Sequence, residues 1–132
     1  MSSGVVADRE AITVAFDALD AALDAVLGLD SSMLDTRERL DRLARYENVR
    51  RRLSAGEHPL INELQREASP AELGGKLSHA IAEATLISRA EAGRRVRDAA
   101  DLGERRALTG EPLAPVLAAT AAAQRDGRLG VE

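Results

Sequence analysis

The sequence contains no cysteine, which excludes disulfide bonds, thiol catalysis and thiolate metal sites. Long apolar runs are also missing, since none approaches the roughly 20 residues that a helix needs to span a bilayer. Residues 1–9 lack the basic start and the apolar core of a secretory signal peptide. We therefore expect a soluble, cytoplasmic protein without a membrane partner.

Aromatic residues are scarce, because Phe16 and Tyr46 are the only two. Strands favour aromatic and β-branched residues, whereas this chain is rich in the strong helix formers alanine (25 residues) and leucine (18 residues). The composition predicts the all-α class, a helical bundle with no sheet. A chain of 132 residues fits one domain, and 45% hydrophobic with 30% charged residues is an ordinary globular composition.

An excess of basic charge is absent as well. The 18 Lys and Arg residues face 22 Asp and Glu residues, so the net charge is −4, unlike that of a simple basic protein that wraps nucleic acid. The charge is uneven along the chain, with one Arg and seven acids in residues 1–35 but seven Arg and three acids in residues 36–52. Opposite charges and a short turn predict that two antiparallel helices begin the chain.

Apolar spacing predicts the first helix over residues 8–27. Its apolar seam follows a 4-3-4-3 spacing and comprises Ile12, Phe16, Leu19, Leu23 and Val26. A second helix is predicted to start after Asp35, which forms a capping box with Glu38. We expect this helix to break or kink at Gly56 and Pro59, because proline lacks the backbone N–H and clashes with the preceding turn.

Two more capping boxes, Ser69 with Glu72 and Ser88 with Glu91, predict further helix starts. The chain then divides into a helical hairpin (8–68), a helix-turn-helix-like part (69–104) and a last helix (113–126). All three belong to one predicted domain spanning 1–132. We expect this domain to be the N-terminal portion of a longer protein.

The segment 76–102 has the size of a helix-turn-helix unit, with a helix over 76–84, a tight turn and a second helix over 88–102. Apolar and small residues occupy the positions that such a unit turns inward, namely Ile81, Ala82, Ile87, Ala92 and Val96. Two positions depart from the pattern. Leu86 stands where the turn usually has glycine, and Arg95 stands where an apolar residue is common.

The second helix of this unit carries the candidate DNA contacts. Arg94 and Arg95 are expected to project outward toward phosphates or guanine edges, and Arg89 toward a backbone phosphate at the helix start. Together with Ser88 they form the predicted DNA-binding set. An alternative interpretation is that the arginines serve only i,i+4 ion pairs on an exposed helix. These pairs would be Glu91–Arg95, Arg94–Asp98 and Arg97–Asp101.

Catalytic and cofactor motifs are not visible in this sequence. His58 and His79 lie 21 positions apart on different predicted helices, so no metal site is expected. A Walker loop, a G-x-G-x-x-G segment and a nucleophile elbow are all absent. We therefore expect no enzyme activity, no cofactor, no metal and no small-molecule substrate.

Four segments carry a family resemblance: residues 60–64 (LINEL), 70–76 (PAELGGK), 87–96 (ISRAEAGRRV) and 106–113 (RALTGEPL). In these segments the chain resembles the actinobacterial thirteen-E-twelve repeat family, and the resemblance covers essentially its whole length. The resemblance implies a helical domain of unknown function that generally precedes a C-terminal HNH nuclease domain. It supplies no functional residues, and the clustered His and Asn residues of an HNH site are missing here.

Three hypotheses for the function remain open. The first is a DNA-binding domain that targets a nuclease-type mobile-element or repeat-family protein to double-stranded DNA. The second is a protein–protein interaction or dimerisation module without nucleic-acid binding, in which the seam from Ile12 to Val26 or the last, alanine-rich helix meets a partner. For this module we expect a homodimer formed through the first two helices. The third is an N-terminal fragment with no independent role.

Overall fold

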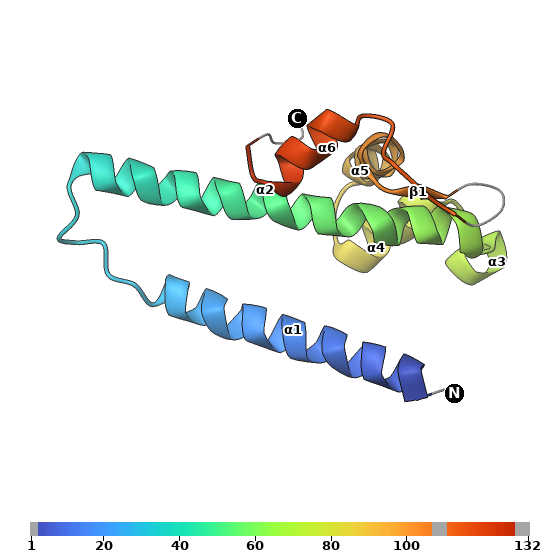
Figure 1. The fold of residues 1–132 in the computed structure, drawn as a ribbon, viewed down its shortest axis with the longest axis horizontal. Helices are drawn as coiled ribbons and strands as arrows, with labels where there is room; N and C mark the ends of the chain where they lie inside the picture. Colours follow the sequence, from blue (N-terminus) through green and yellow to red (C-terminus); the bar gives the residue numbers. More distant parts are fainter. Residues whose placement is uncertain (1–2, 107–110, 129–132) are drawn as a thin grey trace. The chain divides into compact units, whose positions relative to one another are not determined.

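A computed structural model describes residues 3–106 and 111–128, and Figure 1 shows their fold. The all-α class is confirmed. The described helices are α1 (Ser3–Leu27), α2 (Thr36–Glu67), α3 (Pro70–Leu73), α4 (Leu77–Thr85), α5 (Arg89–Leu102) and α6 (Ala118–Arg125). None of these described helices combines the length and the hydropathy that a membrane-spanning segment requires. The chain divides into two compact units, Met1–Leu40 and Asp41–Glu132.

The first unit consists of α1, a connecting loop and the start of α2. The helix α1 begins at Ser3, five residues before the predicted start at Asp8. In the loop, the Asp30 carboxylate accepts hydrogen bonds from the backbone N–H and the hydroxyl of Ser32 (2.8 and 3.0 Å). The predicted capping box at the start of α2 is confirmed, because Asp35 and Glu38 each accept the other's backbone N–H. The antiparallel arrangement of α1 and α2 stays a prediction.

Of the break or kink predicted for the second helix, the break is wrong, and the kink stays a prediction. The helix α2 runs without interruption through Gly56 and Pro59 to Glu67. A proline inside a helix removes one backbone hydrogen bond. Here, tertiary contacts of the neighbouring residues stabilise the same helical turn. His58 and Ile61 are buried, and the Asn62 amide donates to the Ala99 carbonyl of α5 at 2.8 Å. These contacts hold the chain helical on both sides of Pro59.

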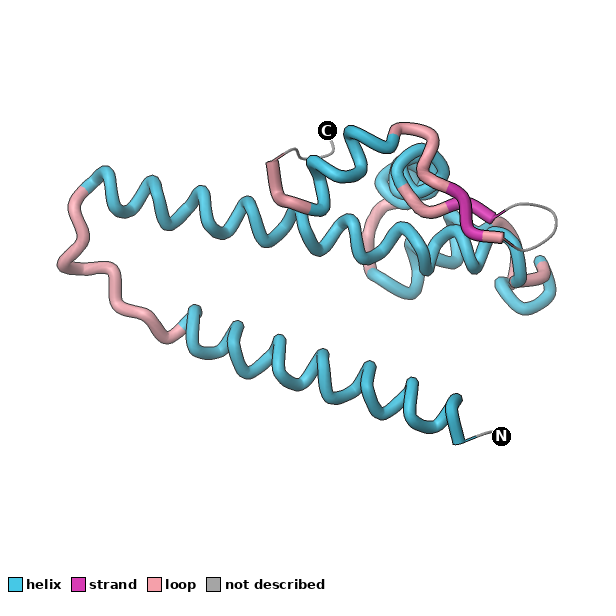
Figure 2. Tube along the Cα trace, viewed as in Figure 1, coloured by secondary structure: helices cyan, strands magenta, loops and turns pink. Residues whose placement is uncertain are grey.

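Two short strands depart from the expectation of a bundle with no sheet. Strands β1 (Arg105–Arg106) and β2 (Pro112–Leu113) pair antiparallel, with Arg105 opposite Leu113 and Arg106 opposite Pro112 (Figure 2). Two residues a strand are too few to show the alternation from which a strand is predicted. The last helix is also shorter than predicted, since α6 begins only at Ala118.

The core of the second unit lies where α5 crosses α2 and packs against α4 (Figure 1). Its buried residues are Ile61, Ile81, Ala82, Ala92 and Ala99, against which Leu77, Ile87 and Val96 pack. Ala92 and Ala99 are fully buried. Side chains this small let helix axes approach closely, so this core is built from alanine and aliphatic residues, as the composition predicts.

Candidate functional site

The helix-turn-helix-like unit is formed by α4 and α5. Leu86 ends α4 in the left-handed conformation (φ 59°), and the Ile87 N–H donates to the Ala82 carbonyl at 3.2 Å. Glycine is the usual residue at a left-handed position that ends a helix, and this protein has leucine there instead. The predicted inward positions Ile81, Ala82 and Ala92 are all buried.

Ser88 and Arg89 start α5 as predicted. The Ser88 hydroxyl accepts the Glu91 backbone N–H at 3.0 Å, which is the N-terminal half of a capping box. The Glu91 carboxylate instead accepts hydrogen bonds from Arg94 and Arg95, so the predicted box is only half made. Arg89 is exposed in the first turn of α5, where the unpaired backbone N–H groups favour an anion.

Arg94 and Arg95 are partly exposed and paired with carboxylates, whereas the sequence suggested that they project outward. Arg94 pairs with Glu91 at 2.8 Å, and Arg95 lies 3.1 Å from Glu91 and 3.7 Å from Glu57 of α2. Their side chains are only 38% and 33% exposed. Of the predicted i,i+4 pairs, Glu91–Arg95 is confirmed. The contact with Glu57 places Arg95 on the α2 side of α5.

Helices α2 and α5 line an open-sided pocket of about 360 Å³, which we call the α2–α5 groove. It is lined by charged and polar side chains of both helices and by one leucine: Glu47, Arg50, Arg51, Leu53, Ser54, Glu57 and His58 of α2, and Glu91, Arg94, Arg95 and Asp98 of α5. The volume lies within the range of about 300–1,000 Å³ typical of small-ligand pockets.

The same sequence pattern, Glu-x-x-Arg-Arg, lines both walls of this groove. On α2, Glu47 lies 3.1 Å from Arg50 and 3.9 Å from Arg51. On α5, Glu91 holds Arg94 and Arg95. Each carboxylate is thus shared by two consecutive arginines at i+3 and i+4. The groove brings together four guanidinium groups that the sequence separates by more than 40 residues.

His58 is buried in the wall of the groove, although it precedes Pro59, where the helix was expected to break or kink. Burial lowers the pKa of His58, and the neighbouring carboxylates of Asp98 and Glu57 act in the opposite direction. Burial also raises the pKa of Asp98, against the attraction of Arg94 and of His58. At neutral pH the groove therefore contains a neutral imidazole next to a partly desolvated carboxyl group.

These shifts predict a pH dependence of stability. A histidine whose pKa falls on folding stabilises the native state above its unfolded-state pKa of 6.5, and this contribution is lost as the pH falls below that value. We expect the midpoint of thermal unfolding to drop between about pH 7 and about pH 5.5, and His58→Leu to flatten this slope.

The control for this measurement is His79→Gln, which removes the chain's other histidine, half-buried on α4. The slope must persist in this variant and be flatter in His58→Leu. Asp98 works in the opposite direction at lower pH, because protonating a carboxyl group with a raised pKa favours the folded state. Equal slopes in wild type and His58→Leu would contradict the assignment.

The groove was not predicted from the sequence. The signal that could have found it is the repetition of Glu-x-x-Arg-Arg at residues 47–51 and 91–95. Among the described residues, the structure places no group of three His, Asp or Glu side chains where a metal ion could bind. The groove offers hydrogen-bond donors and charge rather than metal ligands.

Residues 40–132 match the family model described as Domain of unknown function (DUF222). An uncharacterized protein of Mycobacterium tuberculosis (strain ATCC 25618 / H37Rv) is 56% identical over 122 residues, which cover 92% of this chain and 27% of that protein. A second uncharacterized protein of the same strain is 54% identical over 130 residues, which cover 98% of this chain and 57% of that protein.

An uncharacterized protein of Mycobacterium bovis (strain ATCC BAA-935 / AF2122/97) is 53% identical over 122 residues, covering 92% of this chain and 55% of that protein. The chain thus spans between a quarter and three fifths of the length of these relatives. No solved structure gives a significant match to the chain.

Proposed function

This chain belongs to the family described as Domain of unknown function (DUF222), and on that premise we propose that it is a non-catalytic helical domain that binds double-stranded DNA. The longer relatives have room for further domains. In this proposal the HNH nuclease implied by the thirteen-E-twelve resemblance lies in the rest of the longer protein, and the present domain targets it to DNA.

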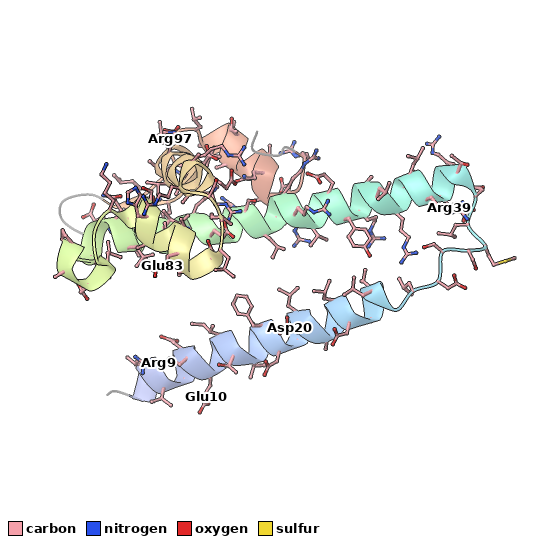
Figure 3. All side chains as sticks on the ribbon, turned by 180° about the vertical axis from the view of Figure 1, so that it is seen from behind. Arg9, Glu10, Asp20, Arg39, Glu83 and Arg97 are labelled. Carbon is pink, nitrogen blue, oxygen red and sulfur yellow. The ribbon has the colours of Figure 1, made fainter. Side chains whose placement is uncertain are left out.

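The observation that carries the proposal is the exposed face of α5. Arg89 and Arg97 are both exposed on this helix, and Figure 3 places Arg97 on the side turned away from α2. The other faces of α5 contact α2, α4 and α6. In a helix-turn-helix unit the second helix enters the major groove with its N-terminal residues toward the bases, and Arg89 occupies that end.

In this proposal, Arg94 and Arg95 contribute less to DNA binding than Arg89 and Arg97. Each is paired with Glu91, so reaching a phosphate requires exchange of a carboxylate for a phosphodiester. Arg89 and Arg97 are more exposed than these two residues. We expect the double variant Arg89→Ala with Arg97→Ala to weaken DNA binding by about 1–3 kcal/mol. It should also reduce the steepness of the plot of log binding constant against log salt concentration by up to about two.

Fluorescence anisotropy on GC-rich duplexes, at low and at physiological salt, tests this expectation. A matched control is Arg45→Ala with Arg66→Ala, which removes the same charge from exposed positions of α2. The control should lose only the non-specific electrostatic part of the affinity. The DNA-binding proposal fails if wild type shows no binding at low salt, or if both double variants lose affinity equally.

A second function is favoured by α1. All five side chains of its apolar seam are exposed, so no part of the first unit covers them. We propose that this seam mediates a homodimer through the first two helices, burying about 1,200–2,000 Å² as stable interfaces do. Sedimentation velocity should show a dimer that Phe16→Asp with Leu23→Asp dissociates. A wild type that stays monomeric at high micromolar concentration contradicts this proposal.

A further inference from the structure

The arginines of the α2–α5 groove carry many more hydrogen-bond donors than the protein uses. Four guanidinium groups have about twenty N–H donors. Their hydrogen bonds to described residues are Arg50 to Glu47, Arg51 to the Gly127 carbonyl, and Arg94 and Arg95 to Glu91. The groove therefore presents a surplus of donors on two facing walls.

Two of these donors are both covered and unpaired. The Nε atoms of Arg51 and Arg94 are shielded from solvent and have no hydrogen-bond partner in the described structure. The Arg51 Nε lies 3.9 Å from the nearest Glu47 oxygen, which is too far for a hydrogen bond. A covered donor without an acceptor costs free energy. A small rotation of the Arg51 or Arg94 side chain that brings its Nε–H to an acceptor bound in the groove is therefore favourable.

The carboxylates of the two Glu-x-x-Arg-Arg segments hold the arginine forks in fixed orientations. Glu91 contacts the Arg94 Nη2 at 2.8 Å and the Arg95 Nε at 3.1 Å, and Glu57 lies 3.7 Å from the Arg95 Nη1, so the Arg94 Nε and the Arg95 Nη2 have no carboxylate partner in the described structure. Arg51, Arg94 and Arg95 are about one third exposed, so their interactions with an anion are less screened than those of fully exposed arginines. Planar guanidinium forks match the geometry of phosphate oxygens.

We propose that the α2–α5 groove is a phosphate-binding site, with Arg50 and Arg51 on one wall and Arg94 and Arg95 on the other. Four carboxylates, Glu47, Glu57, Glu91 and Asp98, also line it. Recognition thus depends on hydrogen-bond geometry more than on net charge. The phosphate group belongs either to a free phosphate or to the DNA backbone, and the second source rests on the proposed function.

The test follows the arginine Nε–H resonances of the ¹⁵N-labelled full chain by NMR. Inorganic phosphate is titrated against sodium chloride at matched ionic strength. We expect saturable shifts for Arg51 and Arg94 with phosphate and none with chloride. Arg51→Lys with Arg94→Lys keeps the charges but removes two forks, and should weaken phosphate binding at least ten-fold, as followed by the Nε–H resonances of Arg50 and Arg95, which line the same groove. Arg45→Lys with Arg52→Lys, at exposed positions of α2, is the matched control and should change nothing.

Glu47→Gln with Glu91→Gln distinguishes binding from a structural role of the arginines. This variant removes the competing carboxylates while keeping their shape, and we expect phosphate to bind several-fold more tightly. A purely structural ion-pair network would show only a lower melting temperature and no gain in affinity. Equal shifts with chloride and phosphate, or equal affinity in the Arg→Lys pair and the wild type, would overturn the proposal.

A short DNA duplex forms the second arm of the experiment. If the duplex shifts Arg51 and Arg94 where free phosphate does not, the groove binds a backbone phosphate. If free phosphate binds and the duplex leaves these signals unchanged, the site serves a free phosphate, and this result holds even if the DNA-binding proposal fails. If neither shifts them, the phosphate site is refuted, whereas DNA binding through Arg89 and Arg97 is judged by its own variants.

Discussion

Replacing Gly103 with alanine is expected to lower the free energy of unfolding by about 2–4 kcal/mol. Gly103 ends α5 with an extended backbone (φ −86°), a conformation that alanine adopts without strain. The cost is therefore steric. An added Cβ would collide with the Asn62 amide and lie 2.6 Å from the Ala99 carbonyl oxygen and 3.0 Å from the His58 Cβ. Relief of this clash breaks the hydrogen bond from Asn62 to Ala99.

Urea denaturation of this variant beside Gly56→Ala provides the measurement and its control. Gly56 lies inside α2, and an added Cβ there meets nothing within 4 Å. Alanine is the better helix former, so Gly56→Ala should raise the free energy of unfolding by about 0.5–1 kcal/mol. The same chemical change thus has opposite signs at the two sites. A neutral Gly103→Ala would show that the contact between α2 and the end of α5 is looser than described.

The second large effect is expected at Gln124 of α6, whose replacement by methionine should raise the free energy of unfolding by about 1–2 kcal/mol. Gln124 is only 1% exposed, and neither its Nε2 nor its Oε1 has a hydrogen-bond partner among the described residues. Methionine has nearly the same length and flexibility but no amide to desolvate. The native state then loses an unpaired polar group and keeps its packing.

Thermal and urea unfolding of Gln124→Met should be compared with Gln65→Met. Gln65 is exposed on α2, so its replacement should change the stability by less than about 0.5 kcal/mol. A destabilised Gln124→Met would mean that the amide has an acceptor and a donor in solution, such as an ordered water. In that case the buried Gln124 amide stabilises the packing of α6 instead of destabilising it.

Local sequence signals predicted several features of both units. The caps at Asp35 and Ser69 are made as the spacing of Ser or Asp with Glu predicts, because a capping box needs only four consecutive residues. The buried face of α4 and α5 was likewise predicted, since Ile81, Ala82 and Ala92 occupy positions fixed by helical periodicity. Interactions within one or two turns of a helix can be read from the order of residues.

Signals of the same local kind failed where a distant segment intervened. Pro59 was expected to break α2, but packing of His58, Ile61 and Asn62 near α5 keeps the helix continuous. Arg95 was expected to face outward, but Glu57 lies close to it in the folded chain. Both outcomes depend on a contact between α2 and α5, whose residues are about 40 positions apart in the sequence.

The sequence by itself determined the helical class, the capped starts of α2, α3 and α5 and the small-residue core of this protein, since these depend on composition and on neighbours three or four residues apart. Only the tertiary structure decided which face of α5 is open and that two Glu-x-x-Arg-Arg segments line one groove. The physical reason is that the direction in which α5 crosses α2 determines both the exposed face of α5 and the residues that meet in the groove. That crossing is fixed by the close packing of Ala92 and Ala99 and by the space left at Gly103, which no periodicity in a single helix reveals.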